Sequence, residues 1–301
     1  MEKQIRQATT FRTDFIIDDP NEPDLKAMEY ISSVIRYDPS GNVKYECIYD
    51  PQGNEIDKNE STLNSEGKLL EKVMYNEDGE VAERTTYEYD ESGRLKFHYL
   101  HYVDGSKDTV TYTYNSSNEL IGTITTDEEG EIDIVEKYEY SEGNRISEKV
   151  FNNEDELIEE RSYEYDDQGN VIVSTSWSEE DGHRIKIEND FDDKGKLIAS
   201  RTYNENGDMI AREEITLDDE GHIKEVIDET SKGTNKLYVT YDSAGNAIGQ
   251  EEYNQNDELN HKVDRKFNEF NHLIESDVYI NRHGEAISQH YIIRIDYEYY
   301  E

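Results

Sequence analysis

Glycine recurs along this chain at nearly regular intervals, each time just after a short cluster of polar, mostly acidic residues. Sixteen of the 18 glycines belong to this series, and repetition of this kind constrains a fold more strongly than length does. Spacings of 12 and 14 residues tend to alternate, which indicates a two-strand unit of 26 residues. The glycines stand at 41, 53, 67, 79, 93, 105, 130, 143, 169, 182, 195, 207, 221, 233, 245 and 284.

Four gaps in the series hold Asn118, Asp155, Asp257 and Asn271. Asn and Asp are the residues that best replace Gly where the backbone needs a positive φ. We therefore predict turns at these positions too, about twenty in all.

The clearest copy of the turn motif runs from Tyr89 to Leu95. It supplies Asp90 at the first turn position and Gly93 where a type I turn closes through a left-handed bulge residue. The residue four before the Gly should then face the residue two after it across the strands. The residues expected to build such turns and pairs are Tyr89, Asp90, Gly93, Leu95, Tyr165, Gly169 and Val171. Further expected pairs are Tyr37 with Val43, Tyr75 with Val81, Tyr114 with Leu120, Phe151 with Leu157, Phe191 with Leu197, Tyr203 with Met209 and Phe267 with Leu273.

Between the turns, about eight or nine residues remain for each strand, and apolar side chains alternate with polar ones. We expect an all-β fold: a repetitive antiparallel hairpin meander of about 20 strands with one apolar and one wet face. A flat sheet would expose the apolar face, so we expect the sheet to curl into a spiral, half-shell or open barrel.

Residues 1–36 lack the turn series, carry Pro20 and Pro23, and show a brief helical pattern over 24–30. We interpret them as an N-terminal cap segment, residues 37–284 as the repeat domain, and residues 285–301 as a C-terminal closing strand. Repetitive folds need such caps because a terminal repeat lacks a neighbour.

The net charge is −41, from 31 Lys and Arg against 72 Asp and Glu. A chain this acidic should repel nucleic acid and anionic lipid. We therefore expect a basic protein partner, no nucleic acid and no membrane. Neither an export signal nor a long apolar run is visible, and Cys47 is the single cysteine, so a cytoplasmic location is expected. The 24 Tyr argue against a disordered chain.

The segment from Tyr87 to Leu95, with a degenerate copy from Tyr163 to Val171, resembles the signature of YD repeats, also called RHS repeats. The resemblance covers about residues 37–280. It implies β-sheet of the kind that spirals into shells, and in large members these shells enclose a toxin. This chain is short and strongly acidic and shows no toxin-like C-terminal domain, so only the fold is carried over.

No residue pattern indicates catalysis, a cofactor or a metal, and we expect a protein that is not an enzyme. The eight histidines lie apart. A calcium loop at Asp190 and Asp192 fails because Lys194 and Arg201 occupy ligand positions. Trp177 is the only tryptophan, too little aromatic surface for a sugar platform.

The leading functional hypothesis is a non-catalytic binding protein that neutralises a basic toxin, as an immunity protein or antitoxin does. Glu88 and Glu164, on the wet face, are the expected partner-binding residues. The alternative is a structural β-repeat scaffold or shell fragment that acts by assembly. The charge could also serve only to keep an aromatic-rich sheet soluble.

Replacing Gly93 by Val should destabilise the protein by roughly 1–3 kcal/mol, because a β-branched residue is strained at positive φ. Urea unfolding of the two proteins measures the difference. An unchanged midpoint would show that residue 93 does not hold the left-handed position of a turn.

Overall fold

The computed structural model describes residues 3–19, 22–281 and 289–301. Within these ranges the chain forms 22 strands and no helix, so the predicted all-β class is confirmed, and no helix there could span a membrane. All the described strand pairings are antiparallel, as predicted for a hairpin meander. The strands are β1 (Ile5–Asp19), β2 (Glu22–Tyr37), β3 (Val43–Tyr49), β4 (Glu55–Leu63), β5 (Leu69–Tyr75), β6 (Val81–Tyr89), β7 (Leu95–His101), β8 (Lys107–Tyr114), β9 (Leu120–Thr126), β10 (Ile132–Ser141), β11 (Asn144–Phe151), β12 (Leu157–Tyr165), β13 (Val171–Ser178), β14 (Arg184–Phe191), β15 (Leu197–Tyr203), β16 (Met209–Leu217), β17 (Ile223–Thr230), β18 (Gly233–Tyr241), β19 (Ala247–Tyr253), β20 (Leu259–Phe267), β21 (Leu273–Ile280) and β22 (Gln289–Tyr299).

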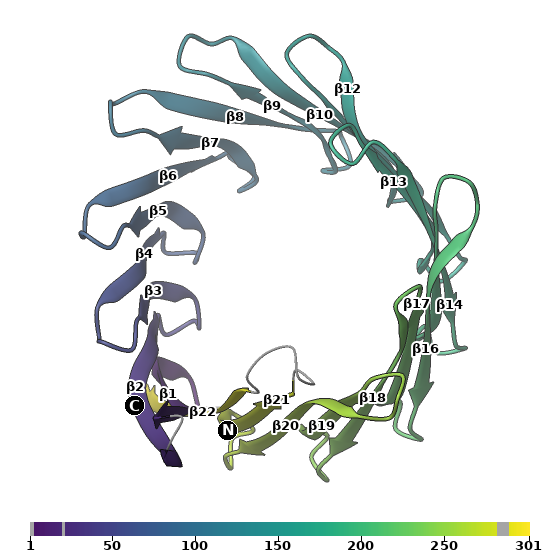
Figure 1. The fold of residues 1–301 in the computed structure, drawn as a ribbon. Helices are drawn as coiled ribbons and strands as arrows, with labels where there is room; N and C mark the ends of the chain where they lie inside the picture. Colours follow the sequence, from purple (N-terminus) through teal and green to yellow (C-terminus); the bar gives the residue numbers. More distant parts are fainter. Residues whose placement is uncertain (1–2, 20–21, 282–288) are drawn as a thin grey trace. The chain divides into compact units, whose positions relative to one another are not determined.

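The chain divides into two compact units, residues 1–85 with 237–301 and residues 86–236. In the first unit, ladders join β19 through β22 in order, then β22 to β1, and then β1 through β5. In the second unit, ladders join β7 through β17 in order along the chain (Figure 1).

The segment 1–36 contributes β1 and β2. The helical pattern that we predicted over 24–30 is wrong, because β2 pairs with β1 through that stretch, as in Lys26 opposite Ile16. One turn of helix without a cap is marginal, and the ladder outweighs it. β1 also pairs with β22. The terminal strands are therefore not free edges, as they would be in an open spiral.

The proposed boundaries at 36/37 and 284/285 stay predictions. The turn expected at Gly284 and the start of the closing strand, 285–288, lie outside the described residues, as does Pro20.

One hydrogen-bonding pattern builds most of the turns. In the turn that begins at Asp166, the N–H of Gly169 donates to the Asp166 carbonyl (3.0 Å), and side-chain Oδ1 accepts the N–H groups of Gln168 and Asn170, both at 2.9 Å. The side chain thus satisfies two backbone donors that the tight turn leaves free. The same pair of side-chain bonds recurs where the first residue is Asp or Asn at 38, 50, 64, 76, 90, 115, 127, 152, 192, 204, 218, 242, 254 and 268.

The residues predicted to replace Gly do hold positive φ: 66° at Asn118, 60° at Asp155, 57° at Asp257 and 62° at Asn271. Not every turn is the same, however. At Gly143 the two strands are joined by a two-residue turn in which Glu142 also has a positive φ of 54°. Such a turn needs left-handed backbone at both central positions.

The predicted cross-strand pairs form in every ladder that shows them. They are Tyr37–Val43, Tyr114–Leu120, Phe151–Leu157, Tyr165–Val171, Phe191–Leu197, Tyr203–Met209 and Phe267–Leu273. Just beyond each pair, the outgoing strand carries one extra residue. Tyr165 faces Val171 while Glu164 faces Val173, so Ile172 lies in a bulge.

The prediction of one apolar and one wet face is wrong. Val150 faces Glu159, on the same face of β12 as Tyr165, whereas the adjacent Phe151 faces Leu157 on the other. Aromatic pairs at the two ends of the strands thus lie on opposite faces. Among the described residues, the buried apolar side chains are few: Ala8, Cys47, Val263 and Val278. Backbone ladders and half-exposed pairs must therefore carry most of the stability.

Replacing Asp166 by Ala should lower the melting temperature at neutral pH, because two backbone N–H groups lose their acceptor. Replacing it by Asn should cost less, since Asn152 and Asn204 make the same bonds in their turns. Thermal unfolding of the three proteins tests the order.

The effect should also depend on pH. Hydrogen bonds from the Asn170 side chain and backbone hold the pKa of Asp166 below its usual value. A lowered folded-state pKa stabilises the fold above the unfolded pKa of about 3.9, and this is lost as pH falls through the folded value. The gap between wild type and Asp166→Ala should therefore shrink below about pH 4. A constant gap would contradict a role for the ionised carboxylate.

Candidate functional site: the acidic edge of the second unit

The structure places the residues singled out from the sequence in two turns of the second unit. Gly169 has a φ of 85°, and beside it Tyr165 faces Val171. Gly93 has a φ of 76°, and its N–H donates to the Asp90 carbonyl at 2.9 Å. Tyr89 and Leu95 end and begin the strands on either side of that turn; their direct pairing stays a prediction.

Because the strands alternate in direction, the turns of the second unit fall into two rows. The first row comprises the turns between β7 and β8 and between β17 and β18 and, between these two, four consecutive turns that join β9 to β10, β11 to β12, β13 to β14 and β15 to β16, through residues 127–131, 152–156, 178–182 and 204–208. We call these four turns the acidic edge. The turns at 90–94, 115–119, 141–144, 166–170, 192–196 and 218–222 form the opposite edge. Neighbouring turns of one row are two strands apart, about 10 Å.

The acidic edge carries carboxylates that its turns do not need. Its four turns contain four, three, three and two acidic residues, and no Lys or Arg. In three of them the first turn position is neutral: Asn152, Ser178 and Asn204 supply the oxygen that accepts backbone N–H groups. The acids instead occupy exposed positions, listed as Glu128, Glu129, Glu131, Glu154, Asp155, Glu156, Glu179, Glu180, Asp181, Glu205 and Asp208.

Hydrogen bonds link neighbouring turns of the opposite edge. Arg94 pairs with Asp90 in its own turn (2.7 Å) and donates to Asn118 in the next (2.7 Å). Lys196 donates to the carbonyl of Gly221. Acidic charge on this row is thus partly neutralised and partly used by the turns themselves.

The predicted partner-binding residues belong near that opposite edge. Glu88 and Glu164 are exposed, as expected, but each lies two residues before an opposite-edge turn. The structure therefore does not bring them to the acidic edge, and their binding role stays a prediction. The edge itself was readable from the sequence by sorting alternate turns into two rows and finding four consecutive turns of one row that hold acids and no Lys or Arg.

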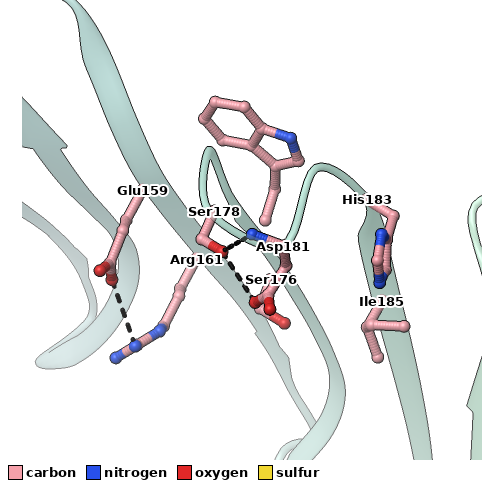
Figure 2. Close-up of a pocket in the computed structure, with 8 residues that line it drawn as sticks. Glu159, Arg161, Ser176, Ser178, Asp181, His183 and Ile185 are labelled. Atoms are coloured by element: carbon pink, nitrogen blue, oxygen red, sulfur yellow. Dashed lines mark hydrogen bonds and ion pairs between the residues drawn. The ribbon is translucent and has the colours of Figure 1, made fainter.

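A hollow of about 320 Å³ opens where β12, β13 and β14 meet the acidic edge (Figure 2). Glu159 pairs with Arg161 at 3.4 Å, and Asp181 accepts a hydrogen bond from Ser178 at 2.8 Å. The other lining residues are Ser176, Trp177, His183 and Ile185. Two further hollows lie along the same row of strand ends, one beside Tyr203 and Glu205 and one beside Met209 and Ser231.

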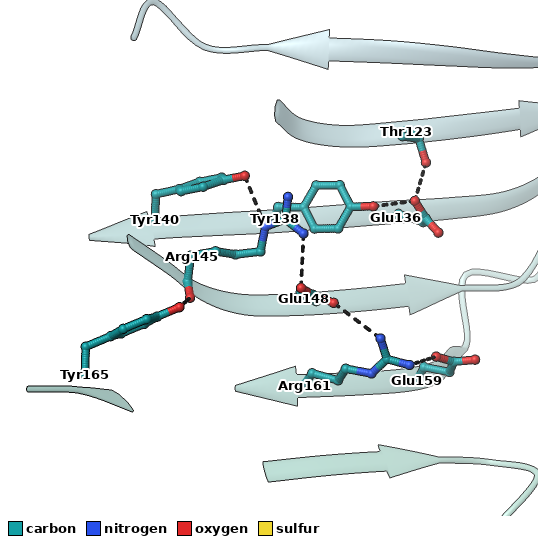
Figure 3. Close-up of polar contacts among 9 residues, drawn as sticks. All are labelled: Thr123, Glu136, Tyr138, Tyr140, Arg145, Glu148, Glu159, Arg161 and Tyr165. Carbon is teal, nitrogen blue, oxygen red and sulfur yellow. Dashed lines mark hydrogen bonds and ion pairs between the residues drawn. The ribbon is translucent and has the colours of Figure 1, made fainter. Parts of the chain in front are cut away.

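A network of polar contacts among side chains crosses strands β9 to β12 toward this hollow (Figure 3). Glu136 accepts hydrogen bonds from Thr123, at 2.7 Å, and from Tyr138. Burial, together with the bond to Glu136, raises the pKa of Tyr138. The network thus holds Tyr138 as a neutral hydrogen-bond donor.

The network continues through Arg145, whose guanidinium carbon lies 4.2 Å from the centroid of the Tyr138 ring. Its guanidinium donates to Tyr140 and Glu148, both at 3.1 Å. Burial lowers the pKa of Arg145, but the bonds to these two side chains outweigh burial and raise it. Glu148 also lies 3.7 Å from Arg161 at the rim of the hollow. The network thus holds the Arg161 side chain, which pairs with Glu159.

Tyrosine hydroxyls satisfy backbone carbonyls at the bulges. Tyr165 donates to the carbonyl of Arg145 at 2.6 Å, and in that ladder Ile146 is the unpaired residue that follows. Tyr297 likewise donates to Leu273 at 2.9 Å, beside the bulge at Ile274. A bulge interrupts the ladder, so such a carbonyl needs another donor. This gives the tyrosine before the turn a hydrogen-bonding role that the sequence argument did not foresee.

On the opposite edge, ligand atoms of Asp218, Glu220 and His222 lie within 4.8 Å of one another. The histidine ring is 3.2 Å from Asp218, whose other oxygen accepts the turn's backbone N–H groups. These contacts are those of an ordinary turn, and we assign no metal to them.

No family model and no curated protein matches the chain. Among solved structures, a chain of TcdB2-TccC3-Cdc42 is similar with 13% identity and a TM-score of 0.35, over 97% of this chain and 20% of that one. The Photorhabdus luminescens Tc holotoxin pore matches with 12% identity and a TM-score of 0.31, over 96% and 20%. A porin-like protein from Bacteroides uniformis matches with 10% identity and a TM-score of 0.33, over 98% of both chains. The chain thus spans about a fifth of the two toxin-complex chains, and likenesses this distant carry no argument about function.

Replacing Tyr165 by Phe should destabilise the protein by about 1 kcal/mol, because the Arg145 carbonyl loses its donor while the ring keeps its packing. Phe151 holds the equivalent position beside an acidic-edge turn, so the ring alone is compatible with the pair. Urea unfolding gives the difference. A variant as stable as wild type would show that water replaces the hydroxyl without cost.

Proposed function

We propose that this chain is a non-catalytic binding protein whose acidic edge binds a basic protein, most specifically a basic toxin that it neutralises. The observation that supports the proposal is the concentration of 12 acidic residues, with no Lys or Arg, in the four consecutive turns of the acidic edge. Turn formation accounts for many acids of the opposite edge, but not for the exposed ones at Glu128, Glu154 or Glu180.

The spacing of the acidic edge suits long-range attraction. Turns about 10 Å apart lie within roughly one Debye length at 0.1 M salt, so their fields add. A row of like charge speeds the encounter with an oppositely charged protein and disfavours acidic ones. Side chains next to these turns are also apolar and exposed: Ile132 is 48% and Met209 53% accessible. A partner that brought both charge and apolar surface would bury them together.

Membership of the YD-repeat family is part of the same proposal. It is supported by the Tyr-Asp-x-x-Gly motif, whose Asp forms the turn bonds at Asp90 and Asp166. The inhibitor role adds to that fold a partner-binding surface on one edge.

Replacing Glu128, Glu129 and Glu131 by Gln should slow association with a basic partner captured from the native lysate about threefold or more at low salt. A matched variant removes three exposed acids of the opposite edge, through Glu91→Gln, Asp167→Asn and Asp219→Asn, and should change the rate much less. Stopped-flow or surface-plasmon measurements at two salt concentrations give the rates.

The two variants have equal net charge, so overall attraction affects both alike. Equal slowing would show that only net charge matters. Binding that ignores both variants and salt, or the recovery of no stable partner, would contradict the inhibitor role and favour the scaffold or the solubility explanation. Charge reversal at Glu88 and Glu164 tests the two residues chosen from sequence.

A further inference from the structure

One face of three strands builds the hollow at the acidic edge. In the ladders, Glu159 faces Ser178. Arg161 faces Ser176, which in turn faces Ile185. Residues directly opposite one another, and residues two apart on one strand, share a face of the sheet. These five side chains therefore line the hollow from the same side (Figure 2).

The walls of the hollow carry acceptor oxygens that the protein does not use. Asp181, in the adjoining turn, accepts a hydrogen bond from Ser178 through Oδ2 at 2.8 Å. Glu159 pairs with Arg161 through Oε2 at 3.4 Å. Within the described ranges, Asp181 Oδ1, Glu159 Oε1 and the hydroxyl of Ser176 make no hydrogen bond. Three free acceptors thus border a hollow of about 320 Å³.

The charges of the hollow are only partly balanced. Arg161 lies at its rim, 3.4 Å from Glu159 and 3.7 Å from Glu148, and the Arg161 side chain is 53% exposed. Asp181 has no such neighbour: in the part of the chain that the structure describes, no Lys or Arg pairs with it. The hollow should therefore attract a positively charged guest at Asp181.

The shape and chemistry of the hollow favour lysine over arginine. Ile185 gives an apolar wall for a methylene chain, and His183 completes the lining. An ammonium group has three donors, as many as the free acceptors. Arginine would gain by stacking on an aromatic face, but the Trp177 ring lies on the other face of the sheet, with Glu160 and Arg184. A volume of about 320 Å³ is at the small end for ligand sites and suits one long side chain better than a cofactor.

We propose that this hollow receives a lysine side chain of the basic partner, with its ammonium group between Asp181 and Glu159 and its methylene groups along Ile185. The inference rests on the proposed function and adds to it the residue type that the acidic edge selects. Arg161 then competes with the guest for Glu159. Removing Arg161 should therefore tighten the binding of lysine rather than weaken it.

A short peptide with one central lysine between neutral residues tests the site on the full chain. Methyl NMR of the isotope-labelled protein should show a saturable shift of the Ile185 signals. The same peptide with arginine, or with uncharged norleucine, at its centre should bind more weakly. Unshifted Ile185 signals, or an arginine peptide that binds as tightly as the lysine peptide, would overturn the lysine site.

The same titration of variants separates the hollow from the charge of the whole protein. Asp181→Asn keeps an acceptor for Ser178 and should weaken the lysine peptide about two- to fivefold. Asp219→Asn, the same change on the opposite edge, should leave the affinity unchanged. Arg161→Gln should tighten binding about twofold, because it frees Glu159. Equal weakening by the two Asn variants would show that only net charge acts, and the site would be wrong.

Measurements with the captured basic partner separate this inference from the proposed function. If the Glu128, Glu129 and Glu131 variant slows association while Asp181→Asn leaves the affinity of the complex unchanged, the acidic edge binds the partner and the lysine site is wrong. If neither variant affects the complex, both are wrong. A complex that Asp181→Asn weakens and Asp219→Asn does not supports the lysine site.

Discussion

The fold depends on a side-chain oxygen that accepts two backbone N–H groups in most of the turns. Fifteen turns place Asp or Asn where this oxygen closes the hairpin, and the residue three positions later takes the left-handed backbone. These local bonds set where each strand begins, and so they set the register of the pairs beside the turn. With few buried apolar side chains in the described residues, no large core is present to correct a misplaced turn.

This economy explains how a chain with so little apolar content folds. Each hairpin contributes its own ladder and its turn, many also contribute an aromatic pair beside the turn, and neighbouring hairpins add further ladders. Tyrosine serves twice, because its ring packs across the strands and its hydroxyl reaches the carbonyl exposed by a bulge, as Tyr165 does. The acids needed for turns can be replaced by Asn, and where this happens, as at Asn152 and Asn204, the remaining acids are free for other uses.

Local features were therefore predictable from the sequence, and non-local ones were not. The turn positions, the positive φ of Asn118 and Asp257, and pairs such as Tyr165 with Val171 follow from residues a few positions apart. The ladder between β1 and β22 does not, because these two strands lie at opposite ends of the sequence. The single apolar face failed because strict alternation ignores the bulge that shifts each strand by one residue. For the candidate site, the charge of each turn could be predicted from the sequence. The hollow beside Trp177 could not, because residues of three strands line it.

The ladder between β1 and β22 bears on how the chain reaches this state. It joins residues 5–14 to 291–299, whereas every other described ladder joins strands that follow one another along the chain. Hairpins close over short loops and form quickly, but contacts of such long sequence separation carry a larger loop-closure entropy and come later. Folding should therefore end with a slow step in which β1 pairs with β22, and the facing edges of these two strands stay unpaired until then. An exposed edge is also where a second molecule can add a strand, so the time before closure is when this protein is most prone to aggregate.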